Sequence, residues 1–526
     1  MKRTLPIFGT LVLFLLFSNT VFSQAGTLDA TFGNGGKVTT FTGIPGVPGN
    51  NLVNDSVLQS DGKIILAGNS NSYADGSAFL LARYLPNGAL DTTFGTGGYV
   101  TTLVGNHCTG QSVALQTDGK IVVAGSTYVP SQGAVRTDIM IVRYNENGSL
   151  DTTFDTDGIK VETMDYSQSV NALLIQADGK MVVGGSFESV DNPAFATFGL
   201  ARFNTNGSLD QTYGVSGFVF TSDLSGGEIM DMKFADNENI IAVGRNNYGP
   251  DCVVGKYNAN GEIVTSFGPN GTGLIEEDYR IIALLYKCVI SKNNDIYIGG
   301  ASFDGVKYSA FISKYNASGI ADNSFGVNGK ILRDFGNNIA SFANDITIDH
   351  NDNLLVGYGV GLTSDYNFGI ESYNLSGVLN TSFGTNGYFM TNFGTGHDYF
   401  ETMLVQPDNK IVMAGNKGSF VLARINNTTV LSTIDFAKTE NKINISPNPV
   451  NDYPTLNLEL KESTNLSVDL YDVKGVLVSN LVKNKNYSEG SNTEQLDLSN
   501  KNLSKGIYFL KINGNGKAAK TIKIVK

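Results

Sequence analysis

The chain has 526 residues, of which 16% are charged and 61 are glycine, and its formal net charge is −12. This length suits two to four domains, and the glycine content favours short strands joined by tight turns over long helices. The acidic balance excludes a nucleic-acid-binding surface, because phosphate neutralisation requires clustered Lys and Arg. Three scattered cysteines exclude a disulfide framework and a structural zinc site.

The first 23 residues have the three-part pattern of a secretory signal peptide. Basic residues at positions 2 and 3 precede an apolar run at 11–17, and Val21 and Ser23 are the small residues before a predicted cut at Gln24. The apolar run is shorter than the roughly 20 residues that a membrane-spanning helix needs. No later segment is long and apolar enough to span, so we expect no transmembrane segment after cleavage.

A short motif recurs seven times between residues 28 and 387. Its clearest copies are LDATFGNGG, LDTTFGTGG and LDTTFDTDG, and the later copies are more divergent. A fixed period of this size indicates a solenoid or a propeller. The aromatic residues of the motif are 54 to 62 residues apart, at Phe32, Phe94, Phe154, Tyr213, Phe267, Phe325 and Phe383.

Each repeat contains four predicted strands, which in the first repeat are residues 37–41, 56–59, 63–68 and 78–84. The second and third are joined by QSDGK, which predicts a hairpin with a type I′ turn, because Asp-Gly supplies the positive φ angles of that turn. The third strand is apolar without alternation. This indicates a sheet covered on both faces, as in stacked propeller blades.

The phase of the repeats predicts how the ring closes. The first copy of the motif, at 28–36, precedes any complete repeat, and the last strand of the seventh repeat, at 420–425, is followed by NNTTV where the motif is missing. The N-terminal copy therefore supplies what the seventh repeat lacks, whereas an open solenoid needs caps at both ends. We predict an all-β chain with a seven-bladed β-propeller over residues 24–431.

The segments LDxTFGxxG, QxDGKIVVAG and FxLARYxxxG together resemble the delta-60 repeat family of exported and surface bacterial propeller proteins. The resemblance covers residues 28–425 and is specific in the first three repeats. ADNEN, SKNND and DHNDN replace QxDGK in the fourth to sixth repeats, and they remain polar turns. The family implies the fold, and it implies no chemistry for particular residues.

The repeats stop after residue 431, and residues 432–441 are predicted to be a linker. Residues 442–526 contain alternating strands, a Pro-rich entry and glycine turns, which predicts a small β-sandwich. This stretch closely resembles the type A C-terminal sorting domain of the type IX secretion system. The resemblance implies the type IX machinery as partner, passage through the periplasm and across the outer membrane, and later removal of the tail; an adhesive module is the alternative. The residues that carry it are Pro447, Asn448, Pro449, Tyr471, Asp472, Gly475, Gly506 and Tyr508.

Two residue groups suggest chemistry, but a structural interpretation is favoured for each. His107 lies beside Cys108, and adjacent side chains on a strand point to opposite faces, so they do not form a nucleophile–base pair. Asp151, Asp155 and Asp157 partly resemble a calcium loop, but the distant Glu of an EF-hand is absent and the stretch is a copy of the repeat motif. We therefore assign no catalytic residue, no metal and no cofactor.

The loops between the third and fourth predicted strands should emerge on one face of the propeller. In each of the first six repeats this loop carries an aromatic residue and an acid, a combination that suits sugars or peptide partners. Chance occurrence in a chain rich in Tyr and Asp is the favoured alternative. The residues are Tyr73 with Asp75, Tyr128 with Asp138, Phe187 with Asp191, Tyr248 with Asp251, Phe303 with Asp304, and Asp365 with Tyr366.

These observations lead to two hypotheses for the function. The first is a secreted or cell-surface binding scaffold that is not an enzyme and whose ligand is an extracellular protein or glycan. The alternative is a secreted carbohydrate-active enzyme, a hydrolase or lyase, because a propeller can place paired carboxylates at the mouth of its channel.

Overall fold

In the computed structural model the regular secondary structure of the described residues consists of β-strands and one short 3-10 helix, η1 (Asp236–Glu238). Contacts group it into two compact units, one within Ser23–Thr428 and one within Thr429–Lys526. Among the described residues no helix is long and apolar enough to cross a membrane. The described residues are 24–40, 51–73, 76–105, 107–131, 134–189, 192–221, 224, 226–246, 252–277, 282–336, 338–362, 365–427, 442–460, 463–473, 476–499, 503–514 and 517–526.

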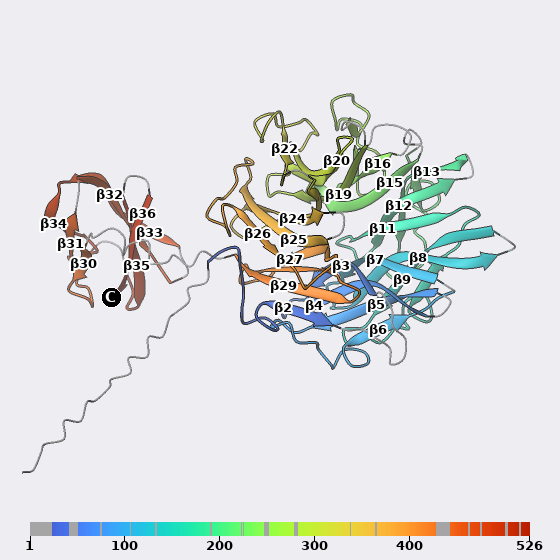
Figure 1. Ribbon diagram of the computed structural model, residues 1–526, viewed down its shortest axis with the longest axis horizontal. Helices are drawn as coiled ribbons and strands as arrows, with labels where there is room; N and C mark the ends of the chain where they lie inside the picture. The colour runs from blue at the N-terminus through green and yellow to red at the C-terminus, as the bar shows by residue number, and fades with distance from the viewer. Residues whose placement is uncertain are drawn as a thin grey trace, which may run out of the picture. The chain divides into compact units, whose positions relative to one another are not determined.

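In the first unit the described strands form seven antiparallel sheets of sequential strands (Figure 1). The first three sheets contain β3 (Asn51–Leu58), β4 (Ile64–Tyr73), β5 (Gly76–Tyr84), β6 (Tyr99–Thr102); β7 (His107–Leu115), β8 (Ile121–Ser131), β9 (Ala134–Tyr144), β10 (Ile159–Glu162); β11 (Gln168–Ile175), β12 (Met181–Ser189), β13 (Asn192–Phe203) and β14 (Phe218–Phe220). The next three contain β15 (Gly227–Phe234), β16 (Ile240–Asn246), β17 (Cys252–Tyr257), β18 (Leu274–Glu277); β19 (Ile282–Ile290), β20 (Ile296–Phe303), β21 (Tyr308–Tyr315), β22 (Lys330–Arg333); β23 (Ala340–Ile348), β24 (Asn353–Leu362), β25 (Asp365–Asn374) and β26 (Tyr388–Thr391). The last contains β27 (Tyr399–Val405), β28 (Ile411–Asn416) and β29 (Phe420–Asn426), with β1 (Thr27–Leu28) and β2 (Lys37–Thr40).

The seven sheets surround a common axis. The first strand of each sheet contacts the first strand of the next, in the order β3, β7, β11, β15, β19, β23, β27, and β27 contacts β3 again. We call these the inner strands; Figure 1 shows most of them around the middle of the unit, with β2, β6 and β22 at its edge. The predicted all-β propeller fold is confirmed.

The core lies between neighbouring sheets. Strands such as β28 and β29 are buried along their whole length, which explains their apolar sequence without alternation. One cluster joins Ile65 and Phe79 of the first sheet to Val123 and Met140 of the second. Each sheet therefore buries both faces against its neighbours.

The N-terminal segment completes the last sheet, as the phase of the repeats predicts. Strand β1 pairs with β29 through Thr27 and Asn426, and β2 pairs with the same strand from Lys37 opposite Ala423 to Thr40 opposite Phe420. Residues almost 400 positions apart in sequence are thus neighbours in one sheet. The chain closes the ring by pairing its beginning with the end of the last repeat.

The QxDGK turns differ from the expected type I′ turn. Gly62 has φ 84° and its N–H donates to the Gln59 carbonyl at 2.9 Å, whereas Asp61 keeps a negative φ. This is a type I turn followed by a left-handed residue, which joins the same strands with a three-residue loop. Asn294 and Asp352 take the left-handed position in the fifth and sixth repeats, and Asn409 takes it in the seventh, with φ of 58° to 67°. Small polar residues tolerate that conformation, so these turns keep the shape. The turn of the fourth repeat differs, because Asn237 and Glu238 both have positive φ, 55° and 57°.

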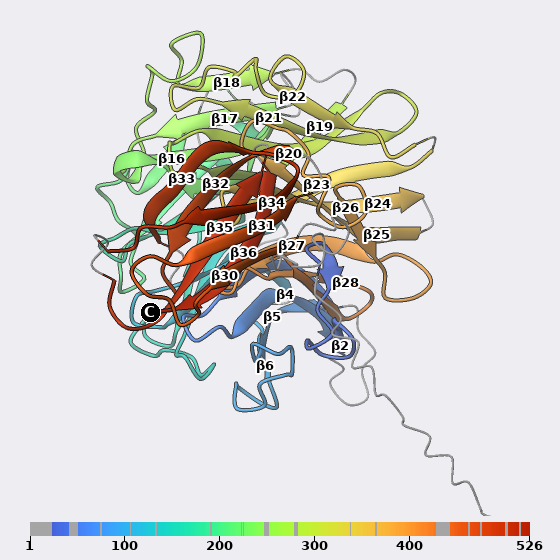
Figure 2. The ribbon, with the colours of Figure 1, turned by 90° about the vertical axis from the view of Figure 1, so that its left-hand side faces the viewer.

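The second unit consists of two sheets that share one apolar core (Figure 2). Its three-stranded sheet has the order β30-β31-β34 and its four-stranded sheet the order β33-β32-β35-β36. Leu456 and Leu458 from the first sheet and Val468 and Leu510 from the second meet in the core. The strands are β30 (Lys442–Ser446), β31 (Thr455–Leu460), β32 (Thr464–Tyr471), β33 (Leu477–Tyr487), β34 (Gly490–Gln495), β35 (Ile507–Gly514) and β36 (Lys517–Val525).

Candidate functional site

The repeated motifs build a clamp between neighbouring sheets rather than a site for chemistry. Arg83 at the end of β5 donates from Nε to Asp91 Oδ2 at 2.8 Å, and its guanidinium lies over the Phe94 ring at 4.6 Å. The same guanidinium donates to the carbonyl of Glu146 in the next sheet. The full arrangement recurs at Arg143, Arg202 and Arg424.

Asp29, the acid of the last clamp, has a strongly lowered pKa. Burial opposes the charge, but hydrogen bonds from Thr31 and the charges of Lys410 and Arg424 lower the pKa of Asp29 to about 2. Asp151 of the calcium-like stretch is a clamp acid of the same kind, since Oδ2 accepts from Arg143 Nε at 2.7 Å and Oδ1 accepts from Thr153. These partners support the structural interpretation of that stretch.

The cysteines are buried and free of disulfides. His107 is exposed, whereas its neighbour Cys108 is completely buried and donates to the Thr102 carbonyl at 3.3 Å. Burial raises the pKa of the Cys108 thiol. The two side chains therefore lie on opposite faces of β7, as the alternation of a strand requires.

Each inner strand carries a β-bulge at the same level of the ring. A bulge leaves one residue out of the ladder and redirects its side chain. The unpaired residues are Asn54, Gln111, Asn171, Met230, Tyr286, Asn344 and Glu401.

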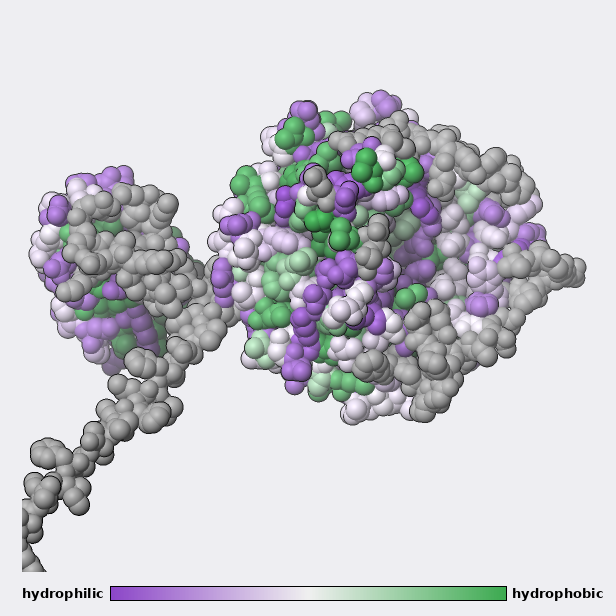
Figure 3. Space-filling model, in the orientation of Figure 1, coloured by the Kyte–Doolittle hydropathy of each residue, from purple (hydrophilic) through white to green (hydrophobic). Residues whose placement is uncertain are grey.

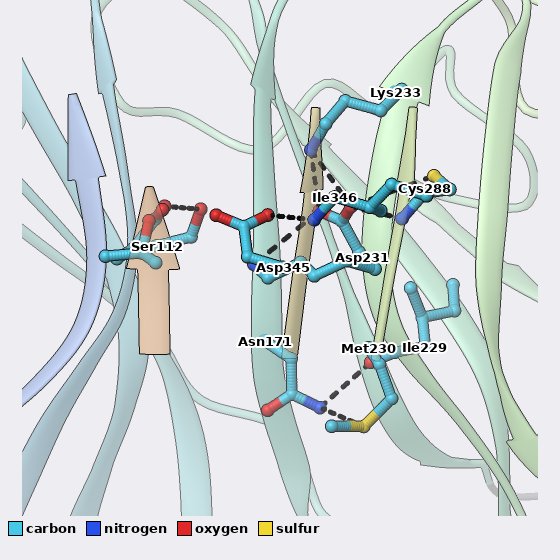
Figure 4. Close-up of polar contacts among 12 residues, drawn as sticks. Ser112, Asn171, Ile229, Met230, Asp231, Lys233, Cys288, Asp345 and Ile346 are labelled. Carbon is cyan, nitrogen blue, oxygen red and sulfur yellow. Dashed lines mark hydrogen bonds and ion pairs between the residues drawn. The ribbon is translucent and has the colours of Figure 1, made fainter. Parts of the chain in front are cut away.

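Polar side chains at and after these bulges link the inner strands (Figure 4). Asp55 accepts from Ser112 Oγ at 2.9 Å, Asp231 accepts from the Cys288 N–H at 3.0 Å, and Asp345 accepts from the Met403 N–H at 2.6 Å. Each contact runs from one sheet to the next. Figure 4 shows the side chains of Asp231 and Lys233 directed toward one another, and their atoms Oδ1 and Nζ are 2.9 Å apart.

The axis therefore concentrates ionisable groups. Burial works against the charge of Lys233, but the carboxylate of Asp231 raises the pKa of this ammonium group. Burial raises the pKa of Asp345 to about 6 and that of Glu401 to about 7. The last two values lie close to neutrality, where general acids and bases operate.

Six aromatic side chains gather at one end of the axis, and we call them the aromatic cluster. In the order Phe303, Tyr308, Phe342, Tyr366, His397 and Tyr399, the centroids of consecutive rings are 5.0, 5.1, 5.9, 5.2 and 5.2 Å apart. The residues come from the fifth, sixth and seventh sheets, at the end where the second strand turns into the third and where one sheet connects to the next. They are Phe303, Tyr308, Phe342, Tyr366, His397 and Tyr399.

Tyr286, the unpaired residue of the bulge in β19, interacts electrostatically with two residues of the cluster. Burial raises the pKa of Tyr286, and the neighbouring Tyr308, Tyr366 and Glu401 raise it further, while Arg245 opposes them. The Tyr286 hydroxyl thus lies within electrostatic reach of two cluster rings and of the near-neutral Glu401. Arg245 itself is paired, because its Nη2 donates to Glu228 Oε2 at 2.7 Å.

The structure brings together only part of the loop residues named from the sequence. Phe303 and Tyr366 belong to the aromatic cluster, and Asp304 and Asp365, their neighbours in sequence, are exposed. Tyr128 contacts His107 edge to face on the second sheet. Phe187 and Asp138 are buried. Tyr73 ends β4 opposite Gly76. Asp75, Asp191, Tyr248 and Asp251 lie outside the described residues.

Phe342 and Tyr399 were missed by sequence reasoning, although a positional signal exists. Each precedes the bulge of its inner strand by two residues and the polar turn by seven. The other repeats have Leu52, Thr109, Ser169, Glu228 and Leu284 at this position. Comparison of the repeats at that position would have identified the two rings.

The tail residues named from the sequence tie the last strand to the rest of the second unit. Asn448 donates from Nδ2 to the Lys523 carbonyl at 2.9 Å and accepts from the Val525 N–H at 3.0 Å. Gly506 and Lys526 exchange two backbone hydrogen bonds of 3.1 and 2.9 Å. Pro447 and Pro449 flank Asn448, and Tyr471 is the last residue of β32. The Asp472 side chain accepts a hydrogen bond from the Val476 N–H, and the Tyr508 hydroxyl donates to the Ser504 carbonyl. Gly475 lies outside the described residues.

Figure 3 shows hydrophobic and hydrophilic residues interspersed over the visible face of the first unit, which is ordinary for an exposed surface. The aromatic cluster is a more specific feature, because it is contiguous and only partly covered. Tyr399 is 48% exposed.

Comparison with known protein families gives a match in each of the two units. A family described as a domain of unknown function (DUF5122) beta-propeller matches residues 59–94, 116–154 and 176–213, and a secretion system C-terminal sorting domain matches residues 444–526. No curated protein matches the chain. Both resemblances drawn from the sequence, to a propeller repeat and to a sorting domain, are confirmed.

Solved structures resemble the chain only distantly. PorZ, an essential bacterial surface component of the type IX secretion system of Porphyromonas gingivalis, has 11% identity and a TM-score of 0.32 over 88% of this chain and 68% of its own. The polysaccharide lyase Uly1 has 13% identity and a TM-score of 0.43 over 78% and 98%. These values are too low to bear on function. The family matches show that the chain contains DUF5122 β-propeller repeats within residues 59–213 and, at residues 444–526, a sorting domain that indicates export through the type IX system to the cell surface or the extracellular space.

Proposed function

We propose that the protein is an exported binding scaffold, not an enzyme, whose ligand docks on the aromatic cluster. The observation that carries the proposal is the contiguous series of partly exposed rings over three sheets at the end of the axis. Aromatic side chains supply large contact areas at small entropic cost, and they dominate the energetics of many binding sites. Export to the surface or beyond gives such a site access to extracellular ligands.

The same proposal assigns a role to each segment of the chain. We infer a signal peptide at 1–23, a propeller at 24–431 that binds, a linker at 432–441 and a sorting domain at 442–526 that is removed after export. Support comes from the compact unit within Ser23–Thr428, which contains the whole aromatic cluster. Binding and export can then be separated by mutation.

The test compares two tyrosines of similar exposure. Tyr399 belongs to the cluster and is 48% exposed, whereas Tyr128 is 39% exposed and lies on the second sheet. We expect Tyr399→Ala to weaken retention of the purified mature protein on envelope and extracellular material of the native host, and Tyr128→Ala to leave it unchanged. Equal retention of both variants and the wild type would contradict the proposal, provided that their melting curves coincide.

A secreted carbohydrate-active enzyme is the second candidate, and it is favoured by two carboxyl groups whose pKa values lie near neutrality. Asp345 and Glu401, on neighbouring inner strands, have pKa values raised by burial to about 6 and about 7. A carboxyl that is protonated near neutrality can serve as a general acid. Turnover of polysaccharides that Glu401→Gln abolishes, while binding persists, would establish this candidate instead.

A further inference from the structure

We propose that the second unit docks on a protein of the type IX export machinery through one apolar face of its folded four-stranded sheet. The proposal goes beyond the ligand proposed for the first unit and does not depend on it. It rests on the match of residues 444–526 to a secretion system C-terminal sorting domain. It names the surface of that domain that is recognised and the chemistry of the partner that fits it.

Exposed large hydrophobic side chains are concentrated in the second unit. Of the 19 such side chains among the described residues, seven lie within residues 453–525, although this unit is much the smaller of the two. Six of the seven lie at one end of the sheet β33-β32-β35-β36, within residues 473–478 and at positions 507 and 525. Scattered exposed hydrophobic residues are ordinary, whereas a contiguous group of them marks an interaction surface.

The strand register makes this group contiguous (Figure 2). Tyr471 on β32 lies opposite Leu477 on β33 and opposite Phe509 on β35. Ile507 precedes Phe509 by two residues on β35 and lies opposite Val525 on β36. Residues directly opposite one another, and residues two apart on one strand, point to the same face of a sheet. We call these five residues the outer patch.

The outer patch departs from the usual pattern of a sheet that meets solvent. Leu470 and Leu510 are completely buried in the core, so the alternation of β32 and β35 turns the residues next to them outward. Further along the same outward face the residues are polar, since Asp469 lies opposite Lys511. Antiparallel sheets with one solvated face ordinarily keep that face polar. The apolar half of the face is therefore not required by the fold, and a partner that covers it would explain it.

The end of the chain is held on both sides, which favours recognition of a folded surface over recognition of a linear peptide. On one side β36 pairs with β35. On the other side the Val450 N–H donates to the Val525 carbonyl at 2.7 Å, and the Val525 N–H donates to Asn448 Oδ1 at 3.0 Å. A receptor that binds an extended peptide by adding a strand needs these backbone groups free. Side chains of the outer patch remain available instead.

Basic side chains border the outer patch and indicate the charge of the partner. Lys523 lies opposite Phe509, and Lys505 comes two residues before Ile507; both lysines are exposed. Residues 437–526 contain 13 lysines and nine acidic residues, whereas the whole chain has a net charge of −12. Complementary charges at the rim of an interface steer association and select the partner. The outer patch therefore fits a protein surface with an apolar centre and an acidic rim.

The test follows the export of full-length variants in the native host by pulse-chase labelling and cell fractionation. Leu477→Ser combined with Ile507→Ser removes two side chains of the outer patch, which are 47% and 39% exposed, so the stability of the fold should change little. We expect export to slow about tenfold, with accumulation in the periplasm, as for the loss of two apolar contacts from an interface. Lys523→Glu should slow export as well, whereas Lys523→Arg should not, because the rim of the partner is acidic.

Two matched controls should be exported like the wild type. Thr521→Ala changes the polar half of the same face, and Val215→Ser removes a 78% exposed apolar side chain from the first unit. Normal export of the double variant, or equally slow export of the controls, would overturn the proposal. A wild-type chain that sediments as a dimer, with a double variant that sediments as a monomer, would also overturn it, because the outer patch would then join two copies.

Coinciding melting curves of the purified full-length proteins show that slow export is not a consequence of unfolding. The Lys523 pair keeps the test decisive if the double variant fails to fold, since both members change only an exposed side chain. Equal export of Lys523→Glu and Lys523→Arg would overturn the proposed acidic partner.

Discussion

Deletion of residues 24–36 should destabilise the propeller far more than a terminal truncation of this length normally does. Chain ends are usually dispensable, but this segment supplies β1 and the clamp residues of the last sheet. Asp29 Oδ2 lies 2.8 Å from Arg424 Nη2, and Phe32 is completely buried beneath the same guanidinium at 4.7 Å. The deletion removes the carboxylate and the aromatic ring that contact Arg424, whose hydrogen bond to the Pro86 carbonyl remains.

The expected cost follows from these two residues. Removing Asp29 leaves a buried cation without its carboxylate, which costs about 3–5 kcal/mol. Removing Phe32 opens a cavity, which costs about 3–5 kcal/mol. The two effects share Arg424 and do not add fully, so the free energy of unfolding should fall by about 5 kcal/mol. That is comparable with the whole stability of a typical domain.

Thermal and denaturant unfolding of the mature chain with and without residues 24–36 measures the effect. Asp91→Ala is the matched control, because Asp91 holds Arg83 in an equivalent clamp away from the closure, and Oδ2 accepts from Nε at 2.8 Å. The deletion should be much more damaging than Asp91→Ala. An unchanged midpoint after the deletion would refute the closure argument.

The remaining predictions concern export and pH. Removal of residues 446–526 should leave a folded propeller in the periplasm of the native host, which cell fractionation measures. Normal export of the tailless form would contradict the proposed role of the tail in export. A mature protein whose intact mass still includes Lys526 would contradict the proposed removal of the tail. Burial raises the pKa of Glu401 from 4.5 to about 7, so the folded state binds this proton more tightly than the unfolded chain does. Its contribution to stability is full below pH 4.5 and is lost as the pH rises to about 7. Glu401→Gln should therefore gain stability relative to the wild type over this interval, and a constant difference between pH 4 and 8 in urea unfolding would contradict the assignment.

The sequence was sufficient for the parts of the fold that depend on local patterns. Asp29, Phe32 and Arg424 each stand in a recognisable copy of a motif, so the pairing of β1 and β2 with β29 was predictable from the phase of the repeats. The turn type was wrong, because the Asp-Gly pair fits two hairpin geometries and the strand register selects the one with Gly62 alone at positive φ.

The candidate site was only partly predictable, for a physical reason. Phe303 and Tyr366 lie in the loops singled out by composition, but Phe342 and Tyr399 lie on inner strands and His397 on a connection between sheets. Their proximity depends on the curvature of the ring, which brings three sheets together at the axis. Phe187 satisfies the same compositional rule and yet is buried against Phe218. Composition cannot distinguish a loop residue at the surface from one that turns inward.

The two ends of the propeller differ in how much the repeats resemble one another, and this difference supports the proposed location of the binding site. In an antiparallel sheet of four sequential strands, the first and third turns lie at one end and the second at the other. The polar turns and the Arg–Asp–aromatic clamps lie at the first end, where the repeats share sequence because each must hold the next sheet. At the second end the repeats differ, and the aromatic cluster occupies it. Variation is tolerated there because the clamps already fix the ring, so this end is free to carry a binding site specific to the protein.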